Sequence, residues 1–154
     1  MAFTDLANYD TLALLLTSAY SDDEKGKYIV DYMDAFAGYM GEIVADRLSI
    51  DDAEAMKKLL ADAGVTPEKI EQFYRDRIPH FDTYLLLAVL QFKKSFLLDY
   101  YRSMLEATTK QKDPSISLWV KIVAAAEEDK WDVVSHLAKH IQEKFYHHIP
   151  QSTI

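Results

Sequence analysis

Three histidines and one glutamate near the end of the chain have the spacing of a metal-binding set. His136, His140, Glu143 and His147 fall at i, i+4, i+7 and i+11, so on one helix they would share a narrow face. An i, i+4 histidine pair beside a carboxylate can hold zinc or nickel. A lone exposed helix, however, lacks the neighbouring groups that orient the ligands in functional metal sites. We therefore favour a solvated helix face, with a physiological metal site as the alternative.

Other catalytic signatures are missing from the sequence. The chain contains no cysteine, which excludes thiolate nucleophiles and cysteine-ligated metals. It has no G-x-x-x-x-G-K-[ST], G-x-S-x-G or H-E-x-x-H motif, and no glutamate is followed three residues later by histidine, as di-iron bundles require. We predict a protein without cofactor and favour a non-enzymatic role, with an enzyme that uses the helix-borne histidines as the less favoured alternative.

The elements that must position these residues are all expected to be helices. Apolar residues recur every three or four positions, with only four Gly and four Pro in 154 residues. Serine, threonine and proline at expected helix starts, and Gly64 at an expected helix end, suggest the boundaries. The expected helices span about 5–20, 21–48, 49–64, 66–78 and 82–108, followed by a polar loop at 108–115 and a helical hairpin at 114–148.

The stretch FDTYLLLAVLQF predicts the central helix. Asp82 is expected to cap it, with Phe81 packing on Leu86 as a hydrophobic staple, and Tyr9, Asp10 and Leu14 repeat this device. Apolar residues cover most of the circumference of 82–108, which predicts a helix enclosed by others. The expected core positions are Leu85, Leu86, Val89, Leu90, Phe92, Phe96, Leu97, Tyr100, Tyr101 and Met104. The predicted fold is all-α, a compact bundle of six to seven helices around a long central apolar helix, with residues 1–154 forming one domain whose core block is about 22–108.

The second expected helix carries the candidate contact residues. Gly38 and Gly41 lie with Asp34 on the side away from the apolar stripe. Glycine inside a helix costs roughly 1 kcal/mol relative to alanine, so two together suggest that another backbone approaches closely; weak selection on an exposed face is the alternative. The apolar stripe consists of Ile29, Met33, Phe36, Met40, Ile43 and Val44.

Three tyrosines line one flank of the same helix. Tyr28, Tyr32 and Tyr39 stand beside its apolar stripe. Tyrosine is enriched at protein interfaces because it combines broad apolar contact with one hydrogen bond. It suits the boundary of a core equally well, and we favour that boundary role while keeping all three as interaction candidates.

The charge distribution limits the partners. The net charge is −8, and residues 1–77 hold sixteen Asp/Glu against eight Lys/Arg. Such a surface disfavours nucleic acids and anionic membranes, and the apolar run after Phe81 is broken by Gln91, Lys93 and Lys94 before it reaches membrane-spanning length. The first residues lack the pattern of a secretory signal, so we expect a cytoplasmic protein.

Two segments carry a resemblance to a known family. EIVADRLSIDDAEAMKKLLADAG and IEQFYRDRIPHFDTYLLLAVLQFKKSF resemble a small all-helical domain family of unknown function from candidate-phyla bacteria of the Patescibacteria type. The resemblance covers about the middle half of the chain and rests on the acidic helix-cap segment, the Phe73 to Pro79 approach, IPHF and FKKSF. It implies a bacterial helical domain and assigns no functional residue.

These observations favour a non-catalytic protein interaction or structural module. The partner would be another protein or a second copy of the chain. The main alternative is a bundle that binds a small apolar ligand between the central helix and its neighbours, since bundle cores host such sites and five methionines would adapt to one. An acidic decoy for a nucleic-acid-binding protein is a further possibility.

Overall fold

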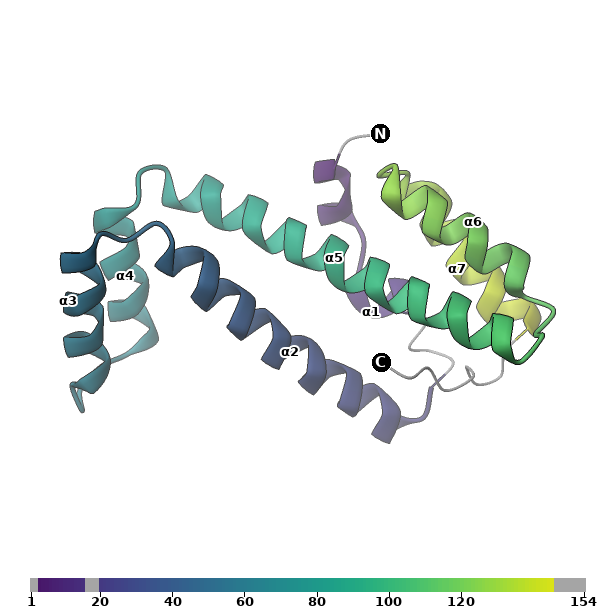
Figure 1. Ribbon diagram of the computed structural model, residues 1–154, viewed down its shortest axis with the longest axis horizontal. Helices are drawn as coiled ribbons and strands as arrows, with labels where there is room; N and C mark the ends of the chain where they lie inside the picture. Colours follow the sequence, from purple (N-terminus) through teal and green to yellow (C-terminus); the bar gives the residue numbers. More distant parts are fainter. Residues whose placement is uncertain (1–2, 16–19, 146–154) are drawn as a thin grey trace. The chain divides into compact units, whose positions relative to one another are not determined.

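The computed structural model describes residues 3–15 and 20–145, and within these residues every regular element is a helix. The predicted all-α class is therefore confirmed (Figure 1). A 3₁₀-helix at Phe3–Asn8 precedes the α-helices α1 (Thr11–Leu14), α2 (Asp22–Ala45), α3 (Ile50–Ala61), α4 (Pro67–Arg77), α5 (Phe81–Lys110), α6 (Ile116–Glu127) and α7 (Trp131–Phe145).

The chain divides into two units. One consists of residues 1–32 and 90–154, and the other of residues 33–89. The boundary falls inside α2 and α5, so each of these helices contributes residues to both units. We call them the terminal unit and the middle unit.

The terminal unit contains the main hydrophobic core. Trp119, Trp131, Tyr101 and Met104 are fully buried there, because the apolar faces of α5, α6 and α7 carry the largest side chains of the chain. The indole of Trp119 makes an edge contact with Tyr100, with ring centroids 6.3 Å apart. In this cluster the predicted core role of the second half of α5 is confirmed.

Buried tyrosine hydroxyls also tie the segments of the terminal unit together. The Tyr101 hydroxyl donates to the Leu14 carbonyl at 2.8 Å, and the hydroxyls of Tyr20 and Tyr100 are 2.8 Å apart. Each tyrosine thus buries a ring while its polar atom keeps a hydrogen-bond partner, as a buried hydroxyl requires.

The first part of the chain differs from its prediction. The expected helix over 5–20 does not extend through Tyr9, where the 3₁₀-helix has ended and α1 has not yet begun. The ammonium group of Lys93, which is buried on α5, donates to the carbonyls of Leu6 and Tyr9. Lys93 thus supplies a donor to carbonyls at the point where the helix stops, and the Leu6 carbonyl also accepts from the Tyr9 amide, so the break leaves neither carbonyl unpaired.

Side-chain caps define the starts of α2, α3 and α4 as predicted. Ser21 and Glu24 form a reciprocal capping box before α2. The Ser49 hydroxyl accepts from the Asp52 amide at the start of α3, and Thr66 caps α4 with Pro67 in its first turn. Local side-chain chemistry is sufficient for these boundaries because each cap lies within three residues of its partner.

Two predicted boundary devices are wrong. Gly64 is not the left-handed residue that ends α3, because that helix ends at Ala61 with Asp62 after it in extended geometry, and no glycine among the described residues has a positive φ. Asp82 does not cap α5. His80 precedes the helix with φ 54° and its carbonyl accepts from the Tyr84 amide, so Phe81 is the first helical residue.

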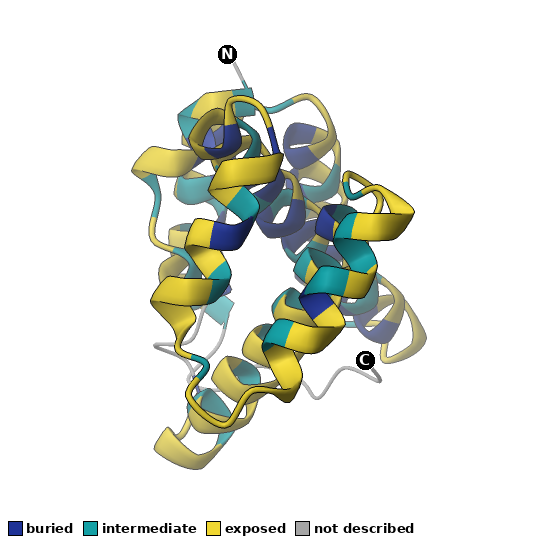
Figure 2. Cartoon of the chain, turned by 90° about the vertical axis from the view of Figure 1, so that its left-hand side faces the viewer, coloured by how far each residue is buried: buried dark blue, intermediate teal, exposed yellow. Residues whose placement is uncertain are grey.

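The expected staple between Phe81 and Leu86 is wrong for the same reason. Phe81 is buried in a small second core with Val44 and Ile78, whereas Leu86 is 53% exposed. Because α5 begins at Phe81, that residue does not precede a capping Asp82 as the staple requires. Helices α3 and α4 consist mostly of exposed and intermediate residues, in the classes that Figure 2 colours; each contains one buried residue, Met56 in α3 and Phe73 in α4.

The apolar stripe predicted for α2 is also partly wrong. Ile29 and Met33 are exposed, and Tyr32 faces inward, with its ring centroid 5.1 Å from that of Phe92 and 4.8 Å from that of Phe96. The aromatic flank of α2 packs here because a tyrosine ring buries more surface than an isoleucine or methionine at the same depth.

The last two helices form a contacting pair. Asp113 begins the turn into α6 by accepting from the amide and hydroxyl of Ser115.

Residues 146–154, which include the predicted end of the last helix near His147, lie outside the described part. Among the residues that are described, no helix is both long enough and apolar enough to cross a membrane.

Candidate binding site

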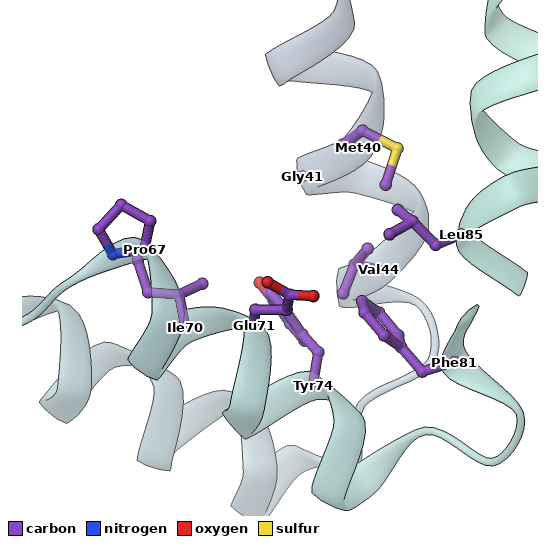
Figure 3. A pocket seen from close by; sticks show the side chains of 9 residues that line it. All are labelled: Met40, Gly41, Val44, Pro67, Ile70, Glu71, Tyr74, Phe81 and Leu85. Carbon is purple, nitrogen blue, oxygen red and sulfur yellow. The ribbon is translucent and has the colours of Figure 1, made fainter.

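The middle unit contains an apolar cavity of about 340 Å³ at the junction of three helices. Side chains from α2, α4 and α5 point toward one another around it (Figure 3). Its lining consists of Met40, Gly41, Val44, Pro67, Ile70, Glu71, Tyr74, Phe81 and Leu85. Gly41, Pro67 and Glu71 are exposed, so the cavity opens to solvent.

The α2 wall of the cavity continues into an exposed row of residues. Met33, Ala37 and Gly41 follow one another at four-residue spacing and therefore lie on one face of α2. All three are exposed, Met33 at 61%. We call these residues the α2 row. It ends at the cavity because Gly41, its last member, is also a lining residue.

The α4 and α5 walls are fixed by the chain turn between them. Ile78 ends α4 in extended geometry, as expected for a residue before proline. His80 then adopts its left-handed conformation, and Phe81 returns to stack on Tyr74 with ring centroids 6.0 Å apart and an angle of 17° between the planes. The Tyr84 hydroxyl donates to the Ile43 carbonyl at 2.8 Å, which attaches α5 to α2.

One carboxylate projects into this otherwise apolar space. Glu71 Oε1 accepts from Arg75 at 2.5 Å, and Arg75 also donates to Asp82 at 2.5 Å. The hydrogen bond with Glu71 makes the larger contribution to raising the pKa of Arg75, and the hydrogen bond with Asp82 adds to it, so the guanidinium stays charged. One cation is thus shared by two anions. Burial also raises the pKa of Tyr74, so its phenol stays neutral.

The interaction candidates on α2 fall into two groups. Gly38, Gly41 and Asp34 are exposed, and Tyr28 and Tyr32 are half-buried. Tyr28 lies 5.0 Å from Tyr20 between ring centroids, which places it within the core boundary of the terminal unit. Tyr39 is half-buried as well. The structure brings only Gly41 of this set to the cavity.

We expect Gly38→Ala to stabilise the chain by about 0.5–1 kcal/mol, because alanine is the better helix former. Beyond its chain neighbours and the backbone of its own helix, a methyl group added at Gly38 would meet no described atom within 4 Å, so no clash opposes the gain. Urea unfolding followed by circular dichroism measures the change. A loss of stability would show that another backbone packs closely on this face.

Three of the predicted metal ligands, His136, His140 and Glu143, lie on α7. His136 and Glu143 are exposed, and His140 makes an edge contact with Phe145 at 6.4 Å between centroids. Within the described residues no group of three His, Asp or Glu side chains is arranged to hold a metal ion. His147 lies outside these residues, so the four-residue set stays a prediction.

The α4 side chains Ile70, Glu71 and Tyr74 of the cavity were not singled out from the sequence. Ile70 and Tyr74 lie four residues apart on α4, whereas Phe81 begins α5, and no spacing rule connects them with the lining residues of α2. The available signal was the pair of prolines, Pro67 and Pro79, which mark where α4 begins and where the chain leaves it. The expectation of an apolar ligand site beside the central helix specified neither this end of α5 nor α4.

Comparisons of the chain with protein-family models, curated proteins and solved structures find no match. The argument for function therefore depends on the geometry of the cavity and of the α2 row.

Proposed function

We propose that the protein is a non-catalytic binding module that receives an apolar segment of a protein partner in the cavity of the middle unit. The partner is another protein or a second copy of this chain. The observation that carries the proposal is the continuity of the cavity with the exposed α2 row through Gly41. We also propose a bacterial, cytoplasmic setting, on the sequence patterns and the family resemblance alone.

The dimensions suit recognition of a helix. From Met33 to Gly41, α2 rises about 12 Å, which is two turns of a partner helix presenting anchors at i, i+4 and i+7. Single exposed apolar residues are ordinary on a protein surface, but a row that leads into an apolar cavity offers a continuous contact surface. Ala37 and Gly41 have almost no side chain, so a partner backbone has room to approach closely.

A matched pair of variants tests this proposal. Gly41→Leu places a large side chain at the junction of the row and the cavity, whereas Ala35→Leu adds similar bulk at an exposed position of α2 away from both. We expect native mass spectra of untagged protein, purified gently, to show a protein complex or homo-oligomer for the wild type and Ala35→Leu and its loss for Gly41→Leu. A bare monomer for the wild type, or a complex that Gly41→Leu leaves unchanged, would contradict the proposal.

A small apolar ligand is the second candidate for the same cavity. Its volume of about 340 Å³ falls at the lower end of the range for small-molecule sites, about 300–1,000 Å³. The same spectra separate the two functions. A retained non-protein mass that disappears in Gly41→Leu would support the ligand and count against the protein partner.

A further inference from the structure

The occupant of the cavity must accommodate the carboxylate of Glu71. Among the nine lining residues of the described chain, Glu71 is the only charged one, and Figure 3 shows its carboxylate directed into the space between Ile70 and Phe81. Covering a carboxylate with apolar groups costs several kcal/mol unless a donor or cation pairs with it. An occupant that covers this carboxylate would therefore bind more tightly if it also supplies a donor or a cation.

Arg75, the cation beside Glu71, does not by itself balance the negative charge at the cavity. Arg75 donates a hydrogen bond from one nitrogen to Glu71 and from another nitrogen to Asp82, so two negative charges share one positive charge. The side chain of Asp82 is 75% exposed, and the carboxylate of Glu71 keeps a second oxygen for a further donor. An additional cation brought by the occupant would complete the charge balance.

The wider electrostatics of the middle unit point the same way. Residues 33–89 contain eleven Asp/Glu and six Lys/Arg, a net charge of −5. Its arginines are engaged within the chain: Arg47 lies 4.5 Å from the centroid of the Tyr84 ring, and Arg77 pairs with Asp52 at 3.1 Å. Acidic residues also stand next to the lining, with exposed Glu42 after Gly41 and exposed Glu68 after Pro67.

We propose that the partner segment is a basic amphipathic helix, whose apolar side chains enter the cavity and lie along the α2 row while a lysine or arginine pairs with Glu71. This inference rests on the proposed function and specifies the chemistry of the partner. Its physical basis is complementarity: apolar anchors match the apolar walls, and flanking cations match the acidic unit.

Two synthetic helical peptides test the charge requirement on the full-length protein. Both are about fifteen residues long, near the minimum for an appreciable helix, and share one leucine face; one has lysine at its polar positions and the other has glutamate. Fluorescence anisotropy of the labelled peptides gives the dissociation constants. We expect the lysine peptide to bind at least about tenfold more tightly, with affinity that falls as salt rises.

Variants locate the binding on the protein. We expect Glu71→Gln to weaken the lysine peptide about fivefold, the size of one partly exposed ion pair. Glu68→Gln removes the same charge from the same helix outside the cavity lining and should change affinity less than about twofold. Gly41→Leu should weaken both peptides at least about tenfold, and Ala35→Leu should have little effect. Circular dichroism confirms that each variant is folded.

The outcomes separate this inference from the proposed function. The inference of a basic helix would be wrong if Gly41→Leu weakened both peptides but the two bound with equal affinity. It would also be wrong if Glu71→Gln and Glu68→Gln had equal effects. Either result would still agree with the proposed binding module. Binding of the lysine peptide that Gly41→Leu does not weaken would mean that any acidic surface suffices, which overturns the inference. Absence of binding by both peptides would overturn both proposals.

Discussion

Replacing Trp119 with alanine is expected to lower the free energy of unfolding by about 3–5 kcal/mol, the usual cost of removing a large aromatic side chain from a packed core. Trp119 on α6 is completely buried, and its ring meets Tyr100 and Tyr101 with centroids 6.3 Å away in each case. The indole joins α5 to α6, so the cavity left behind cannot be filled by one small movement. Since small domains are stable by only about 5–15 kcal/mol, the variant should be partly unfolded well below the melting temperature of the wild type.

Two substitutions make the Trp119 experiment specific. Val120→Ala changes the neighbouring residue on the exposed face and should alter stability by no more than about 0.5 kcal/mol. Trp119→Phe should cost clearly less than Trp119→Ala, because the indole nitrogen has no hydrogen-bond partner among the described residues and only ring volume is lost. Urea unfolding followed by circular dichroism compares all four proteins. A cost below about 1 kcal/mol for Trp119→Ala would contradict the core placement.

Helix class and helix starts were predictable because they depend on neighbours in the sequence. Ser49 and Thr66 cap the helices that follow them through bonds to residues three positions later, and Pro67 and Pro79 restrict the backbone directly. The pairing of α6 with α7 also follows from their short connection and apolar faces. None of these features requires knowledge of a distant residue.

The wrong predictions depend on contacts between distant residues. The break near Tyr9 is stabilised by Lys93, which is 84 positions away, and a lysine inside an apolar pattern looks like an exposed interruption when only the sequence is known. The start of α5 moved because Phe81 contacts Tyr74 and Val44, and this local core favours a left-handed His80 over a cap at Asp82.

In the candidate site, too, features set by neighbouring residues were predictable and features set by distant contacts were not. Gly41 was recognisable as an unusual helical residue, and the structure places it, exposed, in the cavity lining beside Met40 and Val44 of the apolar stripe. The cavity itself was not predictable because its other walls come from α4 and α5. Glu71 gave no signal at all, since an isolated glutamate on a helix normally faces water.

Alkaline solution is expected to unfold the protein through its buried tyrosines. Burial is the main cause that raises the pKa of Tyr20 and Tyr101 far above the ordinary value of 10.0, with the neighbouring hydroxyl of Tyr100 adding to the effect at Tyr20. The unfolded chain releases these protons near pH 10 whereas the folded protein retains them, so stability is full below pH 10 and falls as the pH rises further. Each tyrosine contributes a loss of about 1.4 kcal/mol per pH unit, or about 2.7 for the pair.

Phenylalanine variants assign this slope to individual hydroxyl groups. Tyr101→Phe loses the hydrogen bond to the Leu14 carbonyl, so its stability at neutral pH should fall by about 1–2 kcal/mol, while its alkaline slope becomes shallower by about 1.4 kcal/mol per pH unit. Tyr20→Phe should reduce the slope by a similar amount. Burial lowers the pKa of Lys93, so just below the ordinary lysine pKa of 10.5 this residue makes stability rise with pH and opposes the tyrosine effect. The tyrosine slope is therefore best measured by urea unfolding above pH 10.5. If the alkaline slope of the free energy of unfolding stays unchanged in both variants, these hydroxyl groups already reach water in the folded protein. If the slope is reduced only in Tyr101→Phe, only the hydroxyl in the contact between α5 and α1 is buried and hydrogen-bonded.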